Sequence, residues 1–166
     1  YLFSLLDRFS LDDELTGFLN KLLAGRRQSA HEKIQLIPGV KDCIMRLHFF
    51  YPMAIVTTQD DYSTKHFLTI SGLDQFISKW VTVNTCRRCK QHPEPVLAAA
   101  KLLGVSPKEC LMIGDTTVDI HAGKKAGAQT IGVLCGFGEE KELSRAGADL
   151  ILPSTSNLPE VLLPPR

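Results

Sequence analysis

The chain has 166 residues, of which 44% are hydrophobic and 22% are charged, and its formal net charge is +1. This composition suits one soluble globular domain. The near-zero charge argues against nucleic acid as the main partner, because such binding requires clustered cations. No apolar run approaches the roughly 20 residues of a membrane span, so no membrane partner is expected. Five cysteines at irregular spacing argue against a disulfide framework and favour a reducing cytoplasm.

The first part of the chain is predicted to be helical. Over residues 11–33, apolar side chains recur at helical spacing: Leu15, Phe18, Leu19 and Leu22. Pro38 and Gly39 then break the pattern, and residues 40–49 are predicted to form a short amphipathic helix.

From residue 53 onwards, short apolar runs alternate with helical patterns. The predicted strands are 53–57, 80–84, 111–114, 130–134 and 149–152, and the predicted helices are 65–73, 93–105, 118–128 and 139–148. The strand runs are too apolar to have one face in water. This alternation indicates a parallel sheet covered by helices on both sides.

Two aspartates follow the strand predicted over 111–114, and ligands of open α/β sheets bind beyond such strand ends. Asp115 and Asp119 are four residues apart across a strand-to-helix turn, so both could face one cavity and hold Mg²⁺. Alternatively, Asp115 caps the helix and Asp119 occupies its first turn, where negative charge is favoured. Taken alone, the pair fits both interpretations.

Other polar groups follow two more predicted strands. Thr57 and Thr58 end the strand over 53–57, where hydroxyls and free N–H groups can cradle a phosphate or simply cap a helix. Lys90 lies in the loop before the helix over 93–105, where a single lysine is normally a solvated surface charge.

The order of these groups carries more weight than any one of them. The segments AIVTT, KQHPEPVLAAAKLLGV and LMIGDTTVD match, in order, three motifs of the haloacid dehalogenase-like hydrolase superfamily, which the chain resembles. The continuation AGKKAGAQTIGVLCGFG is similar to the phosphoglycolate phosphatase-like branch. The resemblance covers about residues 34–163 and is most specific over 90–152; Gln91 departs from the proline usual in the lysine motif.

The resemblance implies a three-layer, Rossmann-like α/β core and a Mg²⁺-dependent phosphatase that reacts through an aspartyl-phosphate intermediate. It also implies a role for each matched residue. Thr57, with the backbone of Thr58, would bind the phosphoryl group, and Lys90 would neutralise the phosphate and the nucleophile. Asp115 would bind Mg²⁺, and Asp119 would complete or orient the metal shell. The implied partner is a small phosphorylated metabolite, with phosphoglycolate-like substrates the first to test.

The family's first motif, an apolar strand followed by D-x-D, is not found. The nearest segment, LFSLLDRFSLDD, would make Asp7 the nucleophile, but the second acid would then be Phe9. We therefore expect residues 1–35 to be part of an α-helical cap and residues 36–166 to be a core that lacks its first strand. The nucleophile motif would then lie upstream of Tyr1, and the chain as written would be inactive.

Several alternatives stay open. A catalytically inactive phosphate-binding or scaffold protein would keep the pocket without a nucleophile. A phosphoryl mutase of the same family would share Mg²⁺ and the lysine, whereas a dehalogenase would dispense with the metal and is disfavoured by the acidic pair. Cys86, Cys89 and His92 form C-x-x-C-x-x-H, but a structural zinc site requires a fourth ligand. The oligomeric state is not predicted.

Overall fold

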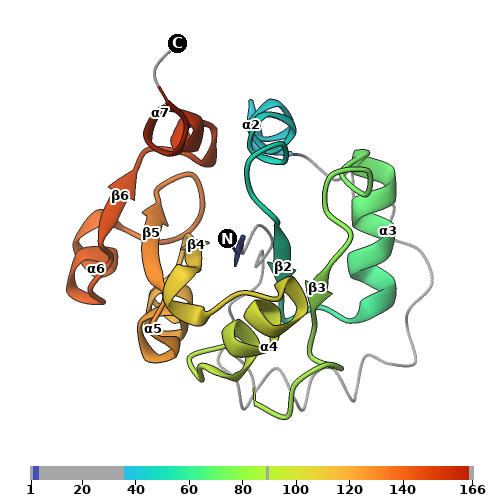
Figure 1. Cartoon of the computed structure of the whole chain (residues 1–166). Coiled ribbons are helices and arrows are strands. Elements are labelled where there is room, and N and C mark those ends of the chain that lie inside the picture. Colours follow the sequence, from blue (N-terminus) through green and yellow to red (C-terminus); the bar gives the residue numbers. More distant parts are fainter. Residues whose placement is uncertain (1, 4–35, 89, 165–166) are drawn as a thin grey trace.

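The protein is built on a parallel sheet, as seen in a computed structural model that describes residues 2–3, 36–88 and 90–164. Within these residues the sheet has six strands in the order β3-β2-β1-β4-β5-β6, and every neighbouring pair is parallel (Figure 1). The strands are β1 (Leu2–Phe3), β2 (Ala54–Val56), β3 (Trp80–Val81), β4 (Leu111–Gly114), β5 (Gln129–Val133) and β6 (Leu150–Leu152).

Helices cover both faces of this sheet. They are α2 (Val40–Leu47), α3 (Asp61–Ser71), α4 (Glu94–Leu103), α5 (Thr117–Ala126), α6 (Glu140–Arg145) and α7 (Leu158–Leu162), with short 3₁₀ turns at Pro107–Glu109 and Thr155–Asn157. Side chains alternate between the two faces of a strand. Ile55 and Ile113 therefore join one core with residues of α2, α3 and α7, whereas Val56 and Met112 join a second core with α4 and α5 (Figure 1). The predicted three-layer α/β fold is confirmed.

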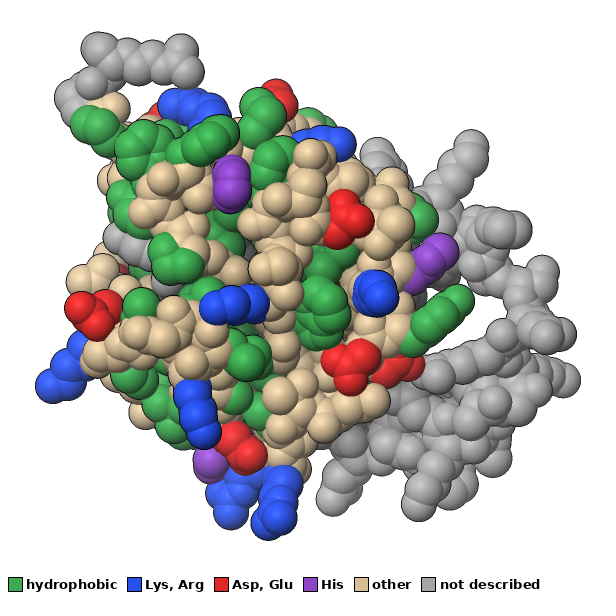
Figure 2. Space-filling model, turned by 45° about the vertical axis from the view of Figure 1, so that its right-hand side comes forward, with side chains coloured by type: hydrophobic (Ala, Val, Ile, Leu, Met, Phe, Trp, Pro, Cys, Tyr) green, Lys and Arg blue, Asp and Glu red, His purple; other side chains and the backbone are tan. Residues whose placement is uncertain are grey.

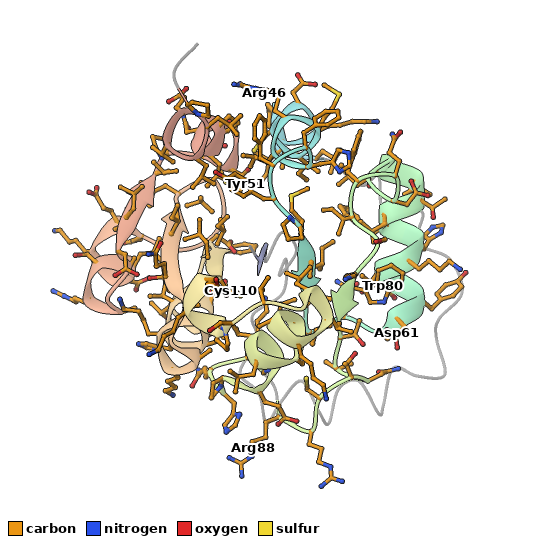
Figure 3. All side chains as sticks on the ribbon, viewed as in Figure 1. Arg46, Tyr51, Asp61, Trp80, Arg88 and Cys110 are labelled. Atoms are coloured by element: carbon orange, nitrogen blue, oxygen red, sulfur yellow. The ribbon has the colours of Figure 1, made fainter. Side chains whose placement is uncertain are left out.

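Several predicted elements differ at their ends, and the cause is visible for two of them. The helix predicted over 65–73 begins earlier, because the carboxylate of Asp60 caps α3 by accepting the backbone N–H of Ser63 at 2.7 Å. The strand predicted over 80–84 ends at Val81, because Thr82 turns the chain: its N–H donates to the hydroxyl of Thr85 at 3.1 Å. Figure 3 shows Trp80 beside Asp61, to which its indole N–H donates at 3.1 Å.

The expectation that the core lacks its first strand is wrong. Leu2 and Phe3 form β1, which pairs with both β2 and β4 at the centre of the sheet. The strand was expected together with a D-x-D motif, but backbone pairing requires only an extended dipeptide that can supply N–H and C=O groups to both neighbours. The expectation of a helical cap over 1–35 is corrected for these two residues. The rest of that segment, including Asp7 and the helix predicted over 11–33, lies outside the described residues.

In the view of Figure 2, acidic and basic side chains are interspersed over the described surface, in keeping with a formal net charge of +1. Across the described part of the chain, none of the helices combines the length and the apolar character that crossing a membrane would take.

Candidate active site

The sheet brings two of the predicted site residues to the same level. Phe3 is paired with Ile55 on one side and with Ile113 on the other. Thr57 and Asp115 each lie two residues beyond these partners, so they lie at the same edge of the sheet with one strand between them. Two strand spacings correspond to about 10 Å. Thr57 is buried, and its hydroxyl accepts the backbone N–H of Gln59 at 3.1 Å.

A buried ion pair lies at the same end of β4. Lys90 comes from the loop between β3 and α4, and Asp119 comes from the first turn of α5. The Nζ of Lys90 is 3.0 Å from Oδ1 of Asp119, and the two side chains are only 2% and 0% exposed. Lys90 is therefore not the solvated surface charge that a single lysine in a loop normally is, because its ammonium is enclosed with a carboxylate.

The second oxygen of Asp119 caps its own helix. Oδ2 accepts the hydroxyl of Thr116 at 2.8 Å and the backbone N–H of Thr116 at 3.3 Å, which completes a capping box. The helix cap is thus Thr116, not Asp115, and the first-turn position expected for Asp119 is confirmed. Gly114 makes room for this carboxyl group, since a Cβ at that position would overlap it. Oδ2 of Asp119 is therefore hydrogen-bonded within the protein, whereas its buried Oδ1 lies in the ion pair with Lys90 but has no hydrogen-bond partner among the described residues.

Asp115 is held differently. Its Oδ2 accepts the backbone N–H of Phe137 at 2.9 Å, and among the described residues no other residue donates a hydrogen bond to its Oδ1. Burial raises the pKa of this carboxyl group above 3.8, and the nearby charge of Asp119 raises it too. The N–H of Phe137, the backbone N–H of Asp115 itself and the charge of Lys90 lower the pKa. Asp115, Asp119 and Lys90 therefore form one electrostatic group, in which Oδ1 of Asp115 accepts no hydrogen bond from another described residue.

The loop after β5 closes over Asp115. Gly136 and Gly138 both approach it so closely that a Cβ at Gly136 would overlap its carboxylate and a Cβ at Gly138 would overlap its backbone carbonyl. The side chain of Phe137 points outward and is 62% exposed. The GFG sequence thus shapes a turn at the rim of the site, and its backbone supplies the N–H that holds the carboxylate.

With this geometry established, the chain can be compared with known proteins. Residues 4–133 match the family described as haloacid dehalogenase-like hydrolase. The chain belongs to the haloacid dehalogenase-like hydrolase family. Its similarity to pyrophosphatase PpaX from Bacillus cereus (strain AH820) is 33% identity over 164 residues, which is 96% of this chain and 75% of that protein. The predicted superfamily is therefore confirmed.

Solved structures agree with this membership. A hydrolase from Pseudomonas syringae matches with a TM-score of 0.78 at 29% identity, over 93% of this chain and 73% of that one. A predicted phosphoglycolate phosphatase from Haemophilus somnus 129PT matches in fold, with a TM-score of 0.72 at 23% identity, over 89% of this chain and 64% of that one. The predicted enzyme class, a phosphatase-type hydrolase, is confirmed by the family match and by the Bacillus cereus relative.

Sequence reasoning missed several residues of this haloacid dehalogenase-like site. The capping hydroxyl of Thr116 had a local signal, because Thr followed three residues later by an acid is a capping box. The contact of Phe137 with Asp115 had none, since the two residues are 22 positions apart in the sequence. The left-handed backbone of Gln91, next to Lys90, had one weak signal: the proline usual at this position, whose φ is fixed at about −65°, is absent.

The zinc alternative gains no support from the described residues. The two ring nitrogens of His92 lie 2.9 Å from a guanidinium nitrogen of Arg88 and 3.2 Å from the backbone nitrogen of Glu94. Arg88 lies at the periphery, beyond α4 (Figure 3). No group of three potential metal ligands occurs in the part of the chain that the structure describes. Cys89 lies outside that part.

Proposed function

We propose that this protein is a Mg²⁺-dependent phosphatase that hydrolyses a small phosphorylated metabolite. The single observation that carries the proposal is the buried Lys90–Asp119 pair beside the open carboxylate of Asp115 at one edge of the sheet. A cation and a carboxylate fixed together in a low-dielectric site are suited to a phosphoryl group and its counter-ion. Pyrophosphate is a first substrate to test because the Bacillus cereus relative is named a pyrophosphatase, and phosphoglycolate-like monoesters are a second.

In this proposal, each residue at the strand ends has its own role. The hydroxyl of Thr57 and the backbone of Thr58 bind the oxygens of the phosphoryl group. Lys90 offsets the negative charge of the phosphate, and its burial strengthens that interaction because little water screens it. The ion pair with Asp119 fixes the position of the ammonium group in the absence of substrate.

The carboxylates fit a magnesium ion. Mg²⁺ in proteins takes one or two carboxylates and completes its octahedron with water and phosphate oxygens. Oδ1 of Asp115 accepts no hydrogen bond from another described residue. Burial raises the pKa of this carboxyl group, and a bound cation would lower it again and favour the ionised form. Oδ2 of Asp119 caps the helix, whereas its buried Oδ1 faces Lys90 without a hydrogen bond, so Asp119 would either complete or orient the metal shell. When bound, the ion would neutralise charge on the phosphoryl group.

A second candidate function is phosphate binding without catalysis. Hydrolysis through an aspartyl-phosphate requires a nucleophilic carboxylate near Thr57, and none is assigned among the described residues; Asp7 lies outside them. The protein would then bind phosphate or a phosphorylated partner without turnover. A phosphoryl mutase of the same family would use the same groups.

The cytoplasmic location stays a proposal, which the four free cysteines in the described part of the chain support.

The test compares turnover with binding. Release of inorganic phosphate from pyrophosphate and from phosphoglycolate is measured with and without Mg²⁺, and binding of inorganic phosphate is measured by calorimetry. A phosphatase shows Mg²⁺-dependent release that Asp115→Asn reduces by at least about 100-fold, the range for removal of one preorganised electrostatic group. Asp149→Asn, which alters the aspartate paired with Lys124 at the other end of α5, is the matched control and should retain activity.

Two results would change the conclusion. Phosphate binding without release of phosphate from either compound would favour the binding protein. Mg²⁺-dependent thermal stabilisation should occur in the wild type and be lost in Asp115→Asn, so equal stabilisation of the two would remove Asp115 from its role as metal ligand.

A further inference from the structure

The loop that carries Lys90 is attached to α5 at two points. The first is the buried pair between Lys90 and Asp119. The second lies one residue further along the loop, where the ammonium of Lys125 donates to the backbone carbonyl of Gln91 at 3.0 Å. Both partners of the loop come from α5, so this helix fixes both the side chain of Lys90 and the backbone that follows it.

The backbone of Gln91 explains why a second attachment is useful. Its φ of 75° is in the left-handed region, and Gln91 is the one residue other than glycine with positive φ in the described part of the chain. This conformation is unfavourable for a residue with a Cβ, and it persists only where the surroundings hold it. The hydrogen bond from Lys125 fixes the carbonyl of this residue and therefore stabilises the turn.

We propose that Lys125 is a positioning residue that aims Lys90 at the phosphate site by holding the left-handed turn at Gln91. Lys90 and Gln91 share a peptide bond, so a change in the Gln91 backbone displaces the Cα from which the Lys90 side chain starts. Because the Lys90 side chain is only 2% exposed, it has little room to compensate for such a displacement. The inference rests on the proposed phosphate-binding role of Lys90.

The chain supplies a matched control in the neighbouring residue. Lys124 is also an exposed lysine of α5, but its ammonium pairs with Asp149 at 2.6 Å and not with the loop. Replacing either lysine by methionine removes one charge and one hydrogen bond from the same helix. A difference between the two variants therefore reports the contact with Gln91 rather than the loss of a lysine.

The first experiment is hydrogen–deuterium exchange on wild type, Lys125→Met, Lys125→Arg and Lys124→Met. In Lys125→Met, the peptide that contains Lys90 and Gln91 should exchange about 2- to 10-fold faster, as expected for loss of one hydrogen bond. Lys125→Arg should restore the wild-type rate, and Lys124→Met should leave this peptide unchanged. Unchanged exchange in Lys125→Met would overturn the proposal, whether or not the protein is an enzyme.

The second experiment is the affinity for inorganic phosphate, measured by calorimetry on the same four proteins. Lys125→Met should weaken binding about 2- to 10-fold, with rescue by Lys125→Arg and no change in Lys124→Met. Faster exchange with unchanged phosphate affinity would overturn the positioning role, since the turn would then not aim Lys90. Absence of phosphate binding in the wild type would instead refute the proposed function, and the exchange rates would still decide whether Lys125 holds the turn.

Discussion

Two lysine–aspartate pairs at opposite ends of α5 show that burial, rather than distance, sets the importance of an ion pair. At the start of the helix, Asp119 pairs with Lys90 at 3.0 Å, and both side chains are almost fully enclosed. At its end, Lys124 pairs with Asp149 at the shorter distance of 2.6 Å, with side chains 41% and 46% exposed. Water screens the exposed pair, which should contribute about 0–1 kcal/mol, whereas breaking a buried pair leaves an uncompensated charge.

The two aspartates also differ in what else they hold. Oδ2 of Asp119 caps α5, on which the candidate site depends. Oδ2 of Asp149 accepts the backbone N–H of Thr130 at 2.8 Å and its hydroxyl at 2.9 Å, which joins the start of β5 to the residue before β6. One pair therefore belongs to the site, and the other belongs to the far end of the sheet.

The largest effect is expected for Asp119→Asn, which removes the negative charge beside the enclosed ammonium of Lys90. We expect a loss of about 3–5 kcal/mol in the free energy of unfolding, the usual consequence of breaking a buried ion pair by removing one partner. Urea denaturation at pH 7, followed by circular dichroism, measures this loss.

The double variant Asp119→Asn with Lys90→Met is the control for that prediction. Because the buried ammonium group is then gone as well, most of the lost stability should return. A loss in the single variant no larger than that of Lys124→Met would contradict the comparison between the two ends of α5.

A smaller effect of opposite sign is expected for Asp115→Asn. Burial raises the pKa of Asp115 above 3.8, so the folded protein binds this proton more tightly than the unfolded chain does. Stability contributed by Asp115 is therefore lost as the pH rises from 3.8 through the raised pKa, and the neutral asparagine avoids this loss. In metal-free buffer, Asp115→Asn should become more stable than the wild type across that window. Urea denaturation at several pH values tests this, and a difference that does not vary with pH would refute it.

The smallest effect is expected for Lys124→Met, which removes the exposed pair. The predicted loss is about 0–1 kcal/mol at pH 7. The hydrogen bond from Lys124 is the first cause that lowers the pKa of Asp149 below 3.8, so this stabilisation is present above pH 3.8 and is lost as the pH falls through the lowered pKa. The difference between Lys124→Met and the wild type should therefore vanish in strong acid. A difference that persists there would mean that the lysine acts through packing rather than charge.

Much of the fold and the site is determined by the sequence itself. The apolar run over 111–114 forms β4 to the residue, because a strand buried on both faces of a parallel sheet is uniformly apolar. The order of Thr57, Lys90 and Asp115 along the chain predicted the family, and the strand ends bring Thr57 and Asp115 to one edge because parallel strands share a direction.

Only the tertiary structure decided how these groups are held. No local pattern predicts that Leu2–Phe3 fill the centre of the sheet, because pairing depends on the backbone and on the neighbours rather than on a motif. Lys90 pairs with Asp119. Asp115 accepts the N–H of Phe137, 22 positions away, and the carbonyl of Gln91 accepts a hydrogen bond from Lys125, 34 positions away. Such contacts are set by packing of separate elements, since neither propensity nor spacing encodes which loop a helix will touch.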